Sequence, residues 1–102
     1  MAEFVEVANV ADIPKGKGLR VVVERKKIAL FNVDGEIYAI DDTCSHAEAS
    51  LSDGELSGCV VECPRHGARF DVRTGAALSM PAWAPVERYD VKVEGDTVKV
   101  AI

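Results

Sequence analysis

The sequence predicts an all-β fold, an antiparallel β sandwich or barrel with a small subdomain inserted into it. Short runs rich in valine and isoleucine recur along the 102 residues and are separated by turn residues. Asp34-Gly35 between two of these runs is a strong signal for a two-residue hairpin. No stretch shows sustained helical periodicity, although residues 47–51 could form one turn. We expect a single domain, residues 1–102, with the inserted subdomain at about residues 42–83.

The first half of the chain contains four short runs with the composition of β-strands, at residues 4–7, 19–24, 28–33 and 36–40. A loop rich in glycine and lysine, residues 12–18, separates the first two runs. The basic run 25–27 is expected to be a solvated hairpin turn, because it lies between two predicted strands.

The second half is expected to contribute four more strands, at residues 59–62, 69–71, 86–93 and 97–102. Asp53-Gly54 marks a turn before them. Valines alternate with other residues in the last two segments, as in half-buried strands, at Val91, Val93, Val98 and Val100. These two strands should therefore form a closing hairpin.

Composition and charge exclude several classes of function. The chain is 48% hydrophobic and 28% charged, as is ordinary for a globular domain, and its net charge is −5. No apolar run approaches the roughly eighteen residues that span a bilayer, and the N-terminus lacks the features of a signal peptide. We expect no membrane and no nucleic acid among its partners. No nucleophile–base pair or phosphate-binding loop predicts catalytic residues.

The two histidines are the most informative residues of the chain. Each lies beside a cysteine, in Cys44-Ser45-His46 and in Cys63-Pro64-Arg65-His66. Ligands this close can sit on a tight turn with both side chains pointing the same way, and Ser and Pro favour such turns. The two pairs together supply the ligand set of a [2Fe–2S] centre in which two histidines replace two cysteines on one iron. We predict one such cluster per chain, bound by Cys44, His46, Cys63 and His66.

A structural zinc site is the alternative for the same four residues, because two cysteines and two histidines also hold zinc tetrahedrally. Zinc sites usually pair cysteine with cysteine and histidine with histidine, whereas each pair here is mixed. With zinc, the chain would be a metal-stabilised module that binds a protein partner.

The surroundings of the ligand pairs resemble the Rieske iron–sulfur proteins. Residues 63–71, followed by Thr74-Gly75, are similar to the second cluster-binding loop of that family and the hairpin after it. Residues 81–85, which include Trp83, occupy the position of the family's proline-rich loop, which covers the cluster. The resemblance implies that the two cysteines bind the inner iron, that the two histidines bind the outer iron, and that a partner docks on the histidine side.

Two departures from the Rieske proteins of cytochrome bc complexes narrow the subtype. Those proteins carry a disulfide beside the cluster, and Ser and Tyr hydroxyls that bond to its sulfurs. Here Arg65 replaces the second-loop cysteine, and Ala68 and Phe70 replace the two hydroxyl donors. Two lost donors, each discriminating between redox states by about 1 kcal/mol, would lower a one-electron potential by roughly 90 mV. We predict the low end of the Rieske range of about −150 to +300 mV.

Low-potential chains of this kind resemble the Rieske-type ferredoxins of bacterial aromatic-ring-hydroxylating dioxygenase systems. The resemblance implies a soluble one-electron carrier with no substrate chemistry of its own. A flavoprotein ferredoxin reductase that depends on NAD(P)H would supply its electrons, and a terminal oxygenase with its own Rieske centre would receive them. We expect a cytoplasmic protein, because thiols stay reduced there. The alternative within electron transfer is a subunit of another redox enzyme, of the nitrite reductase or monooxygenase type.

Charge is unevenly distributed around the ligand pairs. Seven acidic residues and no basic one occur from residue 36 to residue 62, namely Glu36, Asp41, Asp42, Glu48, Asp53, Glu55 and Glu62. They are either a solvated surface or a docking rim beside the first ligand loop. Arg65, Arg69 and Arg73 make the second loop locally basic.

Cys59 is the one cysteine outside the ligand pairs. Its position in a predicted strand favours a small buried hydrophobe, and a reserve ligand or redox-sensitive thiol is the alternative. Trp83 is expected either to contact a partner or to shield the cluster.

Overall fold

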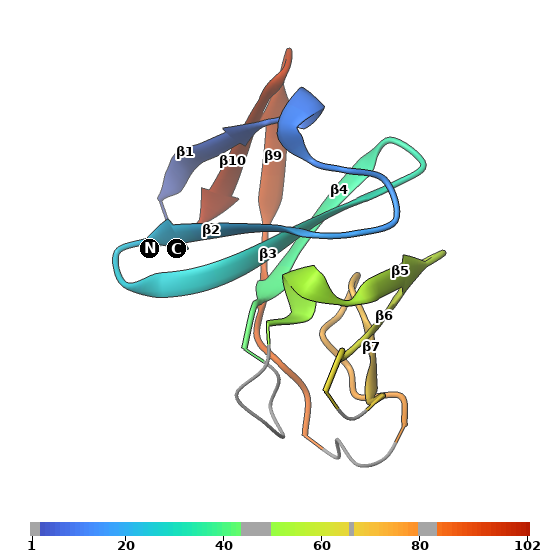
Figure 1. Cartoon of the computed structure of the whole chain (residues 1–102). Helices are drawn as coiled ribbons and strands as arrows, with labels where there is room; N and C mark the ends of the chain where they lie inside the picture. Colours follow the sequence, from blue (N-terminus) through green and yellow to red (C-terminus); the bar gives the residue numbers. More distant parts are fainter. Residues whose placement is uncertain (1–2, 44–49, 66, 80–83) are drawn as a thin grey trace.

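The computed structural model describes residues 3–43, 50–65, 67–79 and 84–102. These residues form ten β-strands and two short 3-10 helices, without an α-helix, which confirms the all-β prediction (Figure 1). The elements are β1 (Phe4–Asn9), η1 (Val10–Asp12), β2 (Leu19–Val23), β3 (Lys26–Val33), β4 (Glu36–Asp41), η2 (Leu51–Asp53), β5 (Glu55–Ser57), β6 (Val60–Glu62), β7 (Arg69–Asp71), β8 (Arg88–Tyr89), β9 (Val91–Glu94) and β10 (Thr97–Ala101). None of the described helices is long or apolar enough to span a bilayer.

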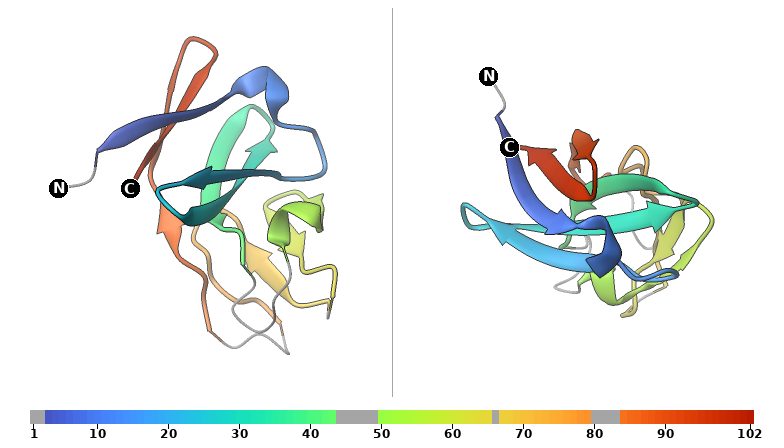
Figure 2. Two further views of the ribbon diagram at one scale, coloured as in Figure 1. Left: turned by 60° about the vertical axis from the view of Figure 1, so that its left-hand side comes forward. Right: turned by 90° about the horizontal axis from the view of Figure 1, so that it is seen from above.

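The strands form three antiparallel sheets, in the orders β1-β10-β9, β2-β3-β4-β8 and β5-β6-β7. The sheet of β2, β3, β4 and β8 lies between the other two (Figures 1 and 2). The β9–β10 hairpin and the β5-β6-β7 sheet are therefore at opposite ends of the molecule.

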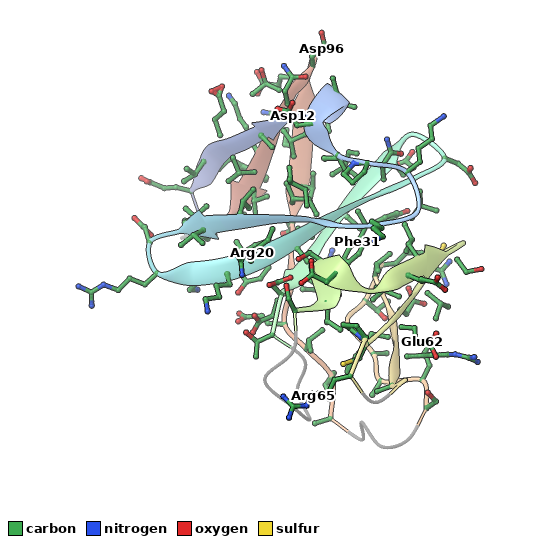
Figure 3. All side chains as sticks on the ribbon, in the orientation of Figure 1. Asp12, Arg20, Phe31, Glu62, Arg65 and Asp96 are labelled. Atoms are coloured by element: carbon green, nitrogen blue, oxygen red, sulfur yellow. The ribbon has the colours of Figure 1, made fainter. Side chains whose placement is uncertain are left out.

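The middle sheet supplies both hydrophobic cores because successive side chains of a strand point to opposite faces. Ile28 and Leu30 of β3 pack with β10 in one cluster. Ala29 and Phe31 pack with β6 and β7 in the other. A continuous apolar run is expected for a strand buried on both faces, and β3 is such a strand. Figure 3 shows Phe31 on the side of the middle sheet that faces the β5-β6-β7 sheet.

The prediction of one strand at residues 86–93 is wrong. β8 pairs with β4, whereas β9 pairs with β10, so the segment passes from the middle sheet to the end sheet. Asp90 lies between the two strands, and its carbonyl oxygen accepts a hydrogen bond from the Ala101 N–H at 2.9 Å. Val93 is 44% exposed and not half-buried, because β9 is an edge strand and Val93 lies near its open end.

Two short segments differ from the sequence-based expectation around residue 58. β5 was not predicted, because Leu56 is its only apolar residue, and it pairs with β6 through Leu56↔Val61. Gly58, with φ +60°, and Cys59 form the turn between β5 and β6, so Cys59 precedes the strand rather than lying in it. The helical turn expected at residues 47–51 falls mostly outside the described residues, and η2 begins only at Leu51.

Candidate metal centre

The second predicted ligand pair lies in the connection between β6 and β7. Cys63 directly follows β6, and its side chain is buried, with 1% exposed. Pro64 and Arg65 after it are exposed, and Figure 3 shows Arg65 at the end of the molecule opposite Asp96. Cys63 is the one predicted ligand that the described residues include. Cys44, His46 and His66 lie outside them.

Backbone hydrogen bonds and one glycine define the turn that carries Cys63. The Cys63 N–H donates to the Ala68 carbonyl at 2.6 Å, and the Gly67 N–H donates to the Cys63 carbonyl at 3.0 Å. Gly67 has φ +74°, a conformation that a side chain disfavours. The turn therefore returns the chain to β7 within a few residues and leaves the Cys63 side chain on the core side.

The chemistry of Cys63 fits a cluster ligand. Its thiol forms no disulfide, and it belongs to the core cluster that also contains Val61 and Phe70. Fe–S clusters are held by cysteine thiolates, and a buried sulfur beside an exposed turn can bind iron while the next residues reach solvent. Cys59 is also free, and it packs against the same core but is only partly buried, whereas the simpler interpretation expected a buried side chain.

The described residues also frame the first ligand pair. β4 ends at Asp41, and Thr43 pairs with Ser50 in an isolated antiparallel bridge. The Asp42 carboxylate is buried, with 1% of the residue exposed. Its Oδ1 accepts a hydrogen bond from the Ser52 N–H at 2.9 Å, and its Oδ2 accepts one from the Ser50 hydroxyl. The chain thus enters and leaves the first ligand loop at neighbouring positions.

Gly54 brings the two ligand-bearing connections together. A Cβ on Gly54 would lie 2.0 Å from the Glu62 carbonyl oxygen, so only glycine allows this approach. Gly54 follows η2, which comes after the first pair, whereas Glu62 immediately precedes Cys63. The close backbone contact fixes the exit of one ligand loop against the entry of the other.

A third connection is held by Gly75. The Val86 N–H donates to the Gly75 carbonyl at 2.9 Å, and a Cβ on Gly75 would lie 2.2 Å from the Val86 carbonyl oxygen. The chain after residues 80–83 is therefore attached to the turn after β7. Trp83 itself lies outside the described residues.

The charges near the site differ from the sequence-based expectation. Arg73 is not a free charge, because its Nε and Nη2 donate to the Asp71 carboxylate at 3.1 and 2.9 Å. This hydrogen bond lowers the pKa of Asp71 below its usual value. Arg65 and Arg69 are exposed.

Two of the seven acidic residues cannot belong to a docking rim beside the first ligand loop. Asp42 is buried. Glu36 begins β4, five residues before Asp41, and so lies roughly 17 Å away from the end of the strand that leads to the first pair. Glu48 lies outside the described residues, while Asp53 and Glu55 are exposed.

Comparison with known proteins identifies the family to which the chain is similar. A family model for the Rieske [2Fe-2S] domain matches residues 3–90. The ferredoxin component of the naphthalene 1,2-dioxygenase system of Pseudomonas aeruginosa is 45% identical over 98 residues, which cover 96% of this chain and 94% of that protein.

Solved structures agree with this similarity. The Sphingomonas yanoikuyae B1 ferredoxin superposes with a TM-score of 0.92 at 36% identity, covering 98% of this chain and 99% of that one. A chain in the complex of reduced oxygenase and oxidized ferredoxin of carbazole 1,9a-dioxygenase superposes with a TM-score of 0.87 at 39% identity, covering 96% of this chain and 92% of that one.

Proposed function

The chain belongs to the Rieske [2Fe-2S] domain family, and on that premise we propose that Cys44, His46, Cys63 and His66 hold its single cluster. Buried, disulfide-free Cys63 supports the assignment for the second pair. The bridge between Thr43 and Ser50 supports it for the first pair, because it brings the two ends of that loop together. The family match favours an iron–sulfur cluster over zinc.

The function is electron transfer. The relatives are ferredoxin components of aromatic dioxygenase systems, which deliver electrons and are not the catalytic components. A [2Fe–2S] cluster supplies one-electron chemistry. The four proposed ligands would hold the cluster, and beside buried Cys63 the residues Pro64 and Arg65 of the second turn are exposed. The alternative of a nitrite reductase subunit is not favoured by these relatives.

The immediate electron acceptor is the terminal oxygenase of such a system. The carbazole 1,9a-dioxygenase complex, in which an oxygenase binds a ferredoxin similar to this chain, supports this partner. We further propose that the acceptor carries its own Rieske centre and that a flavoprotein reductase, using NAD(P)H, supplies the electrons. Naphthalene and carbazole appear in the names of similar proteins, so this fold serves systems with different aromatic substrates.

We also propose that residues 42–83 act as the cluster-binding subdomain. The β5-β6-β7 sheet, which is separate from the other two sheets, supports this division. A cytoplasmic location is proposed because the ligand thiols must stay reduced, and Cys63 and Cys59 are both free.

Cysteine replacement tests the site. The purified protein should show the visible absorbance of an iron–sulfur cluster and an EPR signal on reduction. Cys63→Ser should abolish both, whereas Cys59→Ser, a matched change four residues earlier, should leave them unchanged. A persistent spectrum in Cys63→Ser would overturn the ligand assignment, and a colourless protein that binds zinc would overturn the function.

The midpoint potential tests the subtype. Ala68 and Phe70 are both fully buried, and neither can donate a hydrogen bond through its side chain. We expect a potential at the low end of the Rieske range, and a value above about +100 mV would contradict this expectation.

A further inference from the structure

We propose that Leu78 and Arg69 form the anchor of the site at which the terminal oxygenase docks. The site combines an exposed apolar side chain with an exposed guanidinium, so it fits a partner surface that presents an apolar patch beside a carboxylate. The inference rests on the proposed electron acceptor and deepens it, because it names the residues of this chain that recognise that partner.

The segment that carries Leu78 extends the β5-β6-β7 sheet beyond β7. Phe70 and Ala77 form an isolated antiparallel bridge. The Leu78 N–H donates to the Arg69 carbonyl at 2.7 Å, and the Arg69 N–H donates to the Ser79 Oγ at 3.1 Å. These hydrogen bonds hold Leu78 directly across from Arg69, the first residue of β7.

Leu78 and Arg69 point to the outer face of this sheet. Phe70 is fully buried, and Ala77 packs against the same core cluster. Successive side chains of a strand point to opposite faces, so the neighbouring residues Arg69 and Leu78 face away from that core. Arg69 is exposed, and Leu78 is 51% exposed.

The pair lies in the row of the sheet next to the second ligand turn. Glu62, which ends β6, is the register partner of Arg69. Cys63 follows Glu62 directly. The row of Glu62, Arg69 and Leu78 across the sheet therefore borders the turn that carries a proposed ligand. A partner bound to this row would be adjacent to the proposed cluster site.

The exposure of Leu78 distinguishes it from the rest of its sheet. Among the described residues, four large apolar side chains are exposed, and the three besides Leu78 belong to the other two sheets, namely Phe4, Val22 and Val93. Hydrogen bonds already fix the backbone of Leu78. Burying it against a partner therefore orders little more than one side chain, while the burial of apolar surface favours association.

The charge of Arg69 indicates the chemistry of the partner. No salt bridge includes Arg69 in the part of the chain that the structure describes, although Glu62 is its neighbour across the strands. A guanidinium binds a carboxylate through two parallel hydrogen bonds. Arg65 of the adjacent turn is also exposed, so the complementary surface is acidic around an apolar centre. The oxygenase complex of a ferredoxin 39% identical to this chain supports an oxygenase as the occupant.

Electron exchange with naphthalene 1,2-dioxygenase tests the inference, because the ferredoxin component of that system is 45% identical to this chain. Stopped flow measures the oxidation rate of the reduced, cluster-loaded protein against its concentration, at low and at high salt. Leu78→Ser removes the apolar side chain, and Leu78→Met restores one of similar size. Val22→Ser is the matched control, because Val22 is 62% exposed in β2 of the middle sheet. Arg69→Ala removes the charge.

Leu78→Ser should raise the half-saturating concentration about tenfold, the size expected when about half of a leucine side chain is no longer buried. The rise should be the same at both salt concentrations, because ions do not screen apolar burial, and the limiting rate should be unchanged. Leu78→Met and Val22→Ser should behave like the wild-type protein. Arg69→Ala should raise the half-saturating concentration at low salt and much less at high salt.

An unchanged half-saturating concentration in Leu78→Ser, or the same rise in Val22→Ser, would overturn the docking role of Leu78. No effect of Arg69→Ala at low salt would overturn that of Arg69. A changed oligomeric state of Leu78→Ser, with unchanged electron exchange, would assign the face to a second copy of the chain instead. The visible spectrum and melting temperature should be the same in all variants, and an altered spectrum in Leu78→Ser would replace docking with a role in holding the cluster.

Failure of the inference is distinct from failure of the proposed function. In the first case, the wild-type protein reduces the oxygenase and Leu78→Ser does so equally well. In the second case, the wild-type protein has no iron–sulfur spectrum or does not reduce the oxygenase.

Discussion

At the scale of single residues, Gly67 determines the shape of the second ligand turn. Its φ of +74° lies in the left-handed region, and its N–H closes the turn by donating to the Cys63 carbonyl. Among the described residues, a Cβ on Gly67 would meet only the Glu62 Oε1, at 3.3 Å, so these residues constrain the position mainly through its backbone conformation.

We expect Gly67→Ala to destabilise the protein by about 1 kcal/mol, because alanine is strained at positive φ. The same turn should then hold the cluster less firmly. Gly35→Ala is the matched control, since Gly35 has φ +92° in a hairpin away from the ligand turn, and no non-adjacent described residue has an atom within 4 Å of its Cβ position. Thermal unfolding should show a lower melting temperature for both variants. Only Gly67→Ala should lose its visible spectrum faster than the wild-type protein. Equal rates of loss would contradict a specific role for Gly67.

The phenol of Tyr89 ionises only at strongly alkaline pH. Burial, together with the charges of Glu87 and Asp41, raises the pKa of this phenol to about 12. The hydroxyl donates to the Glu87 carboxylate at 3.3 Å, and the Lys26 ammonium lies 5.6 Å from the ring centroid. The folded state therefore favours the neutral phenol.

Because the pKa of Tyr89 in the folded state exceeds its usual value of about 10, its stabilising contribution is complete below pH 10. The contribution should be lost as the pH rises through about 12. Tyrosinate absorbance should show a step near pH 12 that Tyr89→Phe removes and Tyr38→Phe retains. An unchanged alkaline step in Tyr89→Phe would refute the assignment.

At the scale of elements, the β2–β3 hairpin has an unfavourable turn. Glu24 and Arg25 have φ of 49° and 71°, and the basic run expected to form the turn contributes only Arg25 to it, since Lys26 already begins β3. Two consecutive positive φ values are typical of a type I′ turn, which prefers Asn-Gly.

Replacing Glu24-Arg25 with Asn-Gly should therefore raise stability by about 1 kcal/mol, or roughly 4–8 °C in melting temperature for a domain of this size. The visible spectrum should not change, because the turn lies outside the ligand connections. The control is Asn-Gly at Asp34-Gly35, where glycine already occupies one of the two turn positions and the gain should be smaller. A melting temperature that falls would show that the native pair makes compensating contacts.

The strands differ in how well the sequence predicted them. The β3–β4 hairpin followed from its apolar runs and Asp34-Gly35, because local turn chemistry sets its register. The sequence did not separate β8 from β9, because apolar residues recur at short intervals through Tyr89, Val91 and Val93, and only the pairing partners of the two strands differ. β5 was missed because its pairing with β6, rather than its composition, makes it a strand.

At the scale of the whole molecule, exposed Arg65 of the second ligand turn lies far from two acidic side chains. Figure 3 shows Arg65 at the end of the molecule opposite Asp12 and Asp96. The end of the molecule with the second ligand turn therefore carries exposed positive charge, which the net charge of −5 does not predict. Opposite charge on a partner would raise the rate of encounter.

Electron exchange with a partner should therefore depend on salt. Arg65→Ala combined with Arg69→Ala should slow stopped-flow electron exchange with the oxygenase at low salt and flatten its salt dependence, because screening grows as the Debye length falls to about 8 Å. Arg20→Ala is the control, since Arg20 is exposed on β2 and lies away from Arg65 (Figure 3). Electron-exchange rates that change neither with salt concentration nor in the double variant would exclude electrostatic docking at this end.

The sequence by itself predicted the fold class, the [2Fe–2S] cofactor and the family, because these depend on residue types and short spacings. The tertiary structure decided which groups are accessible. It buried Asp42, paired Arg73 with Asp71, and placed Glu36 at the far end of β4. The burial of Asp42 depends on contacts between segments far apart in the sequence, here with β3 and η2, and no local pattern encodes the free energy of those contacts.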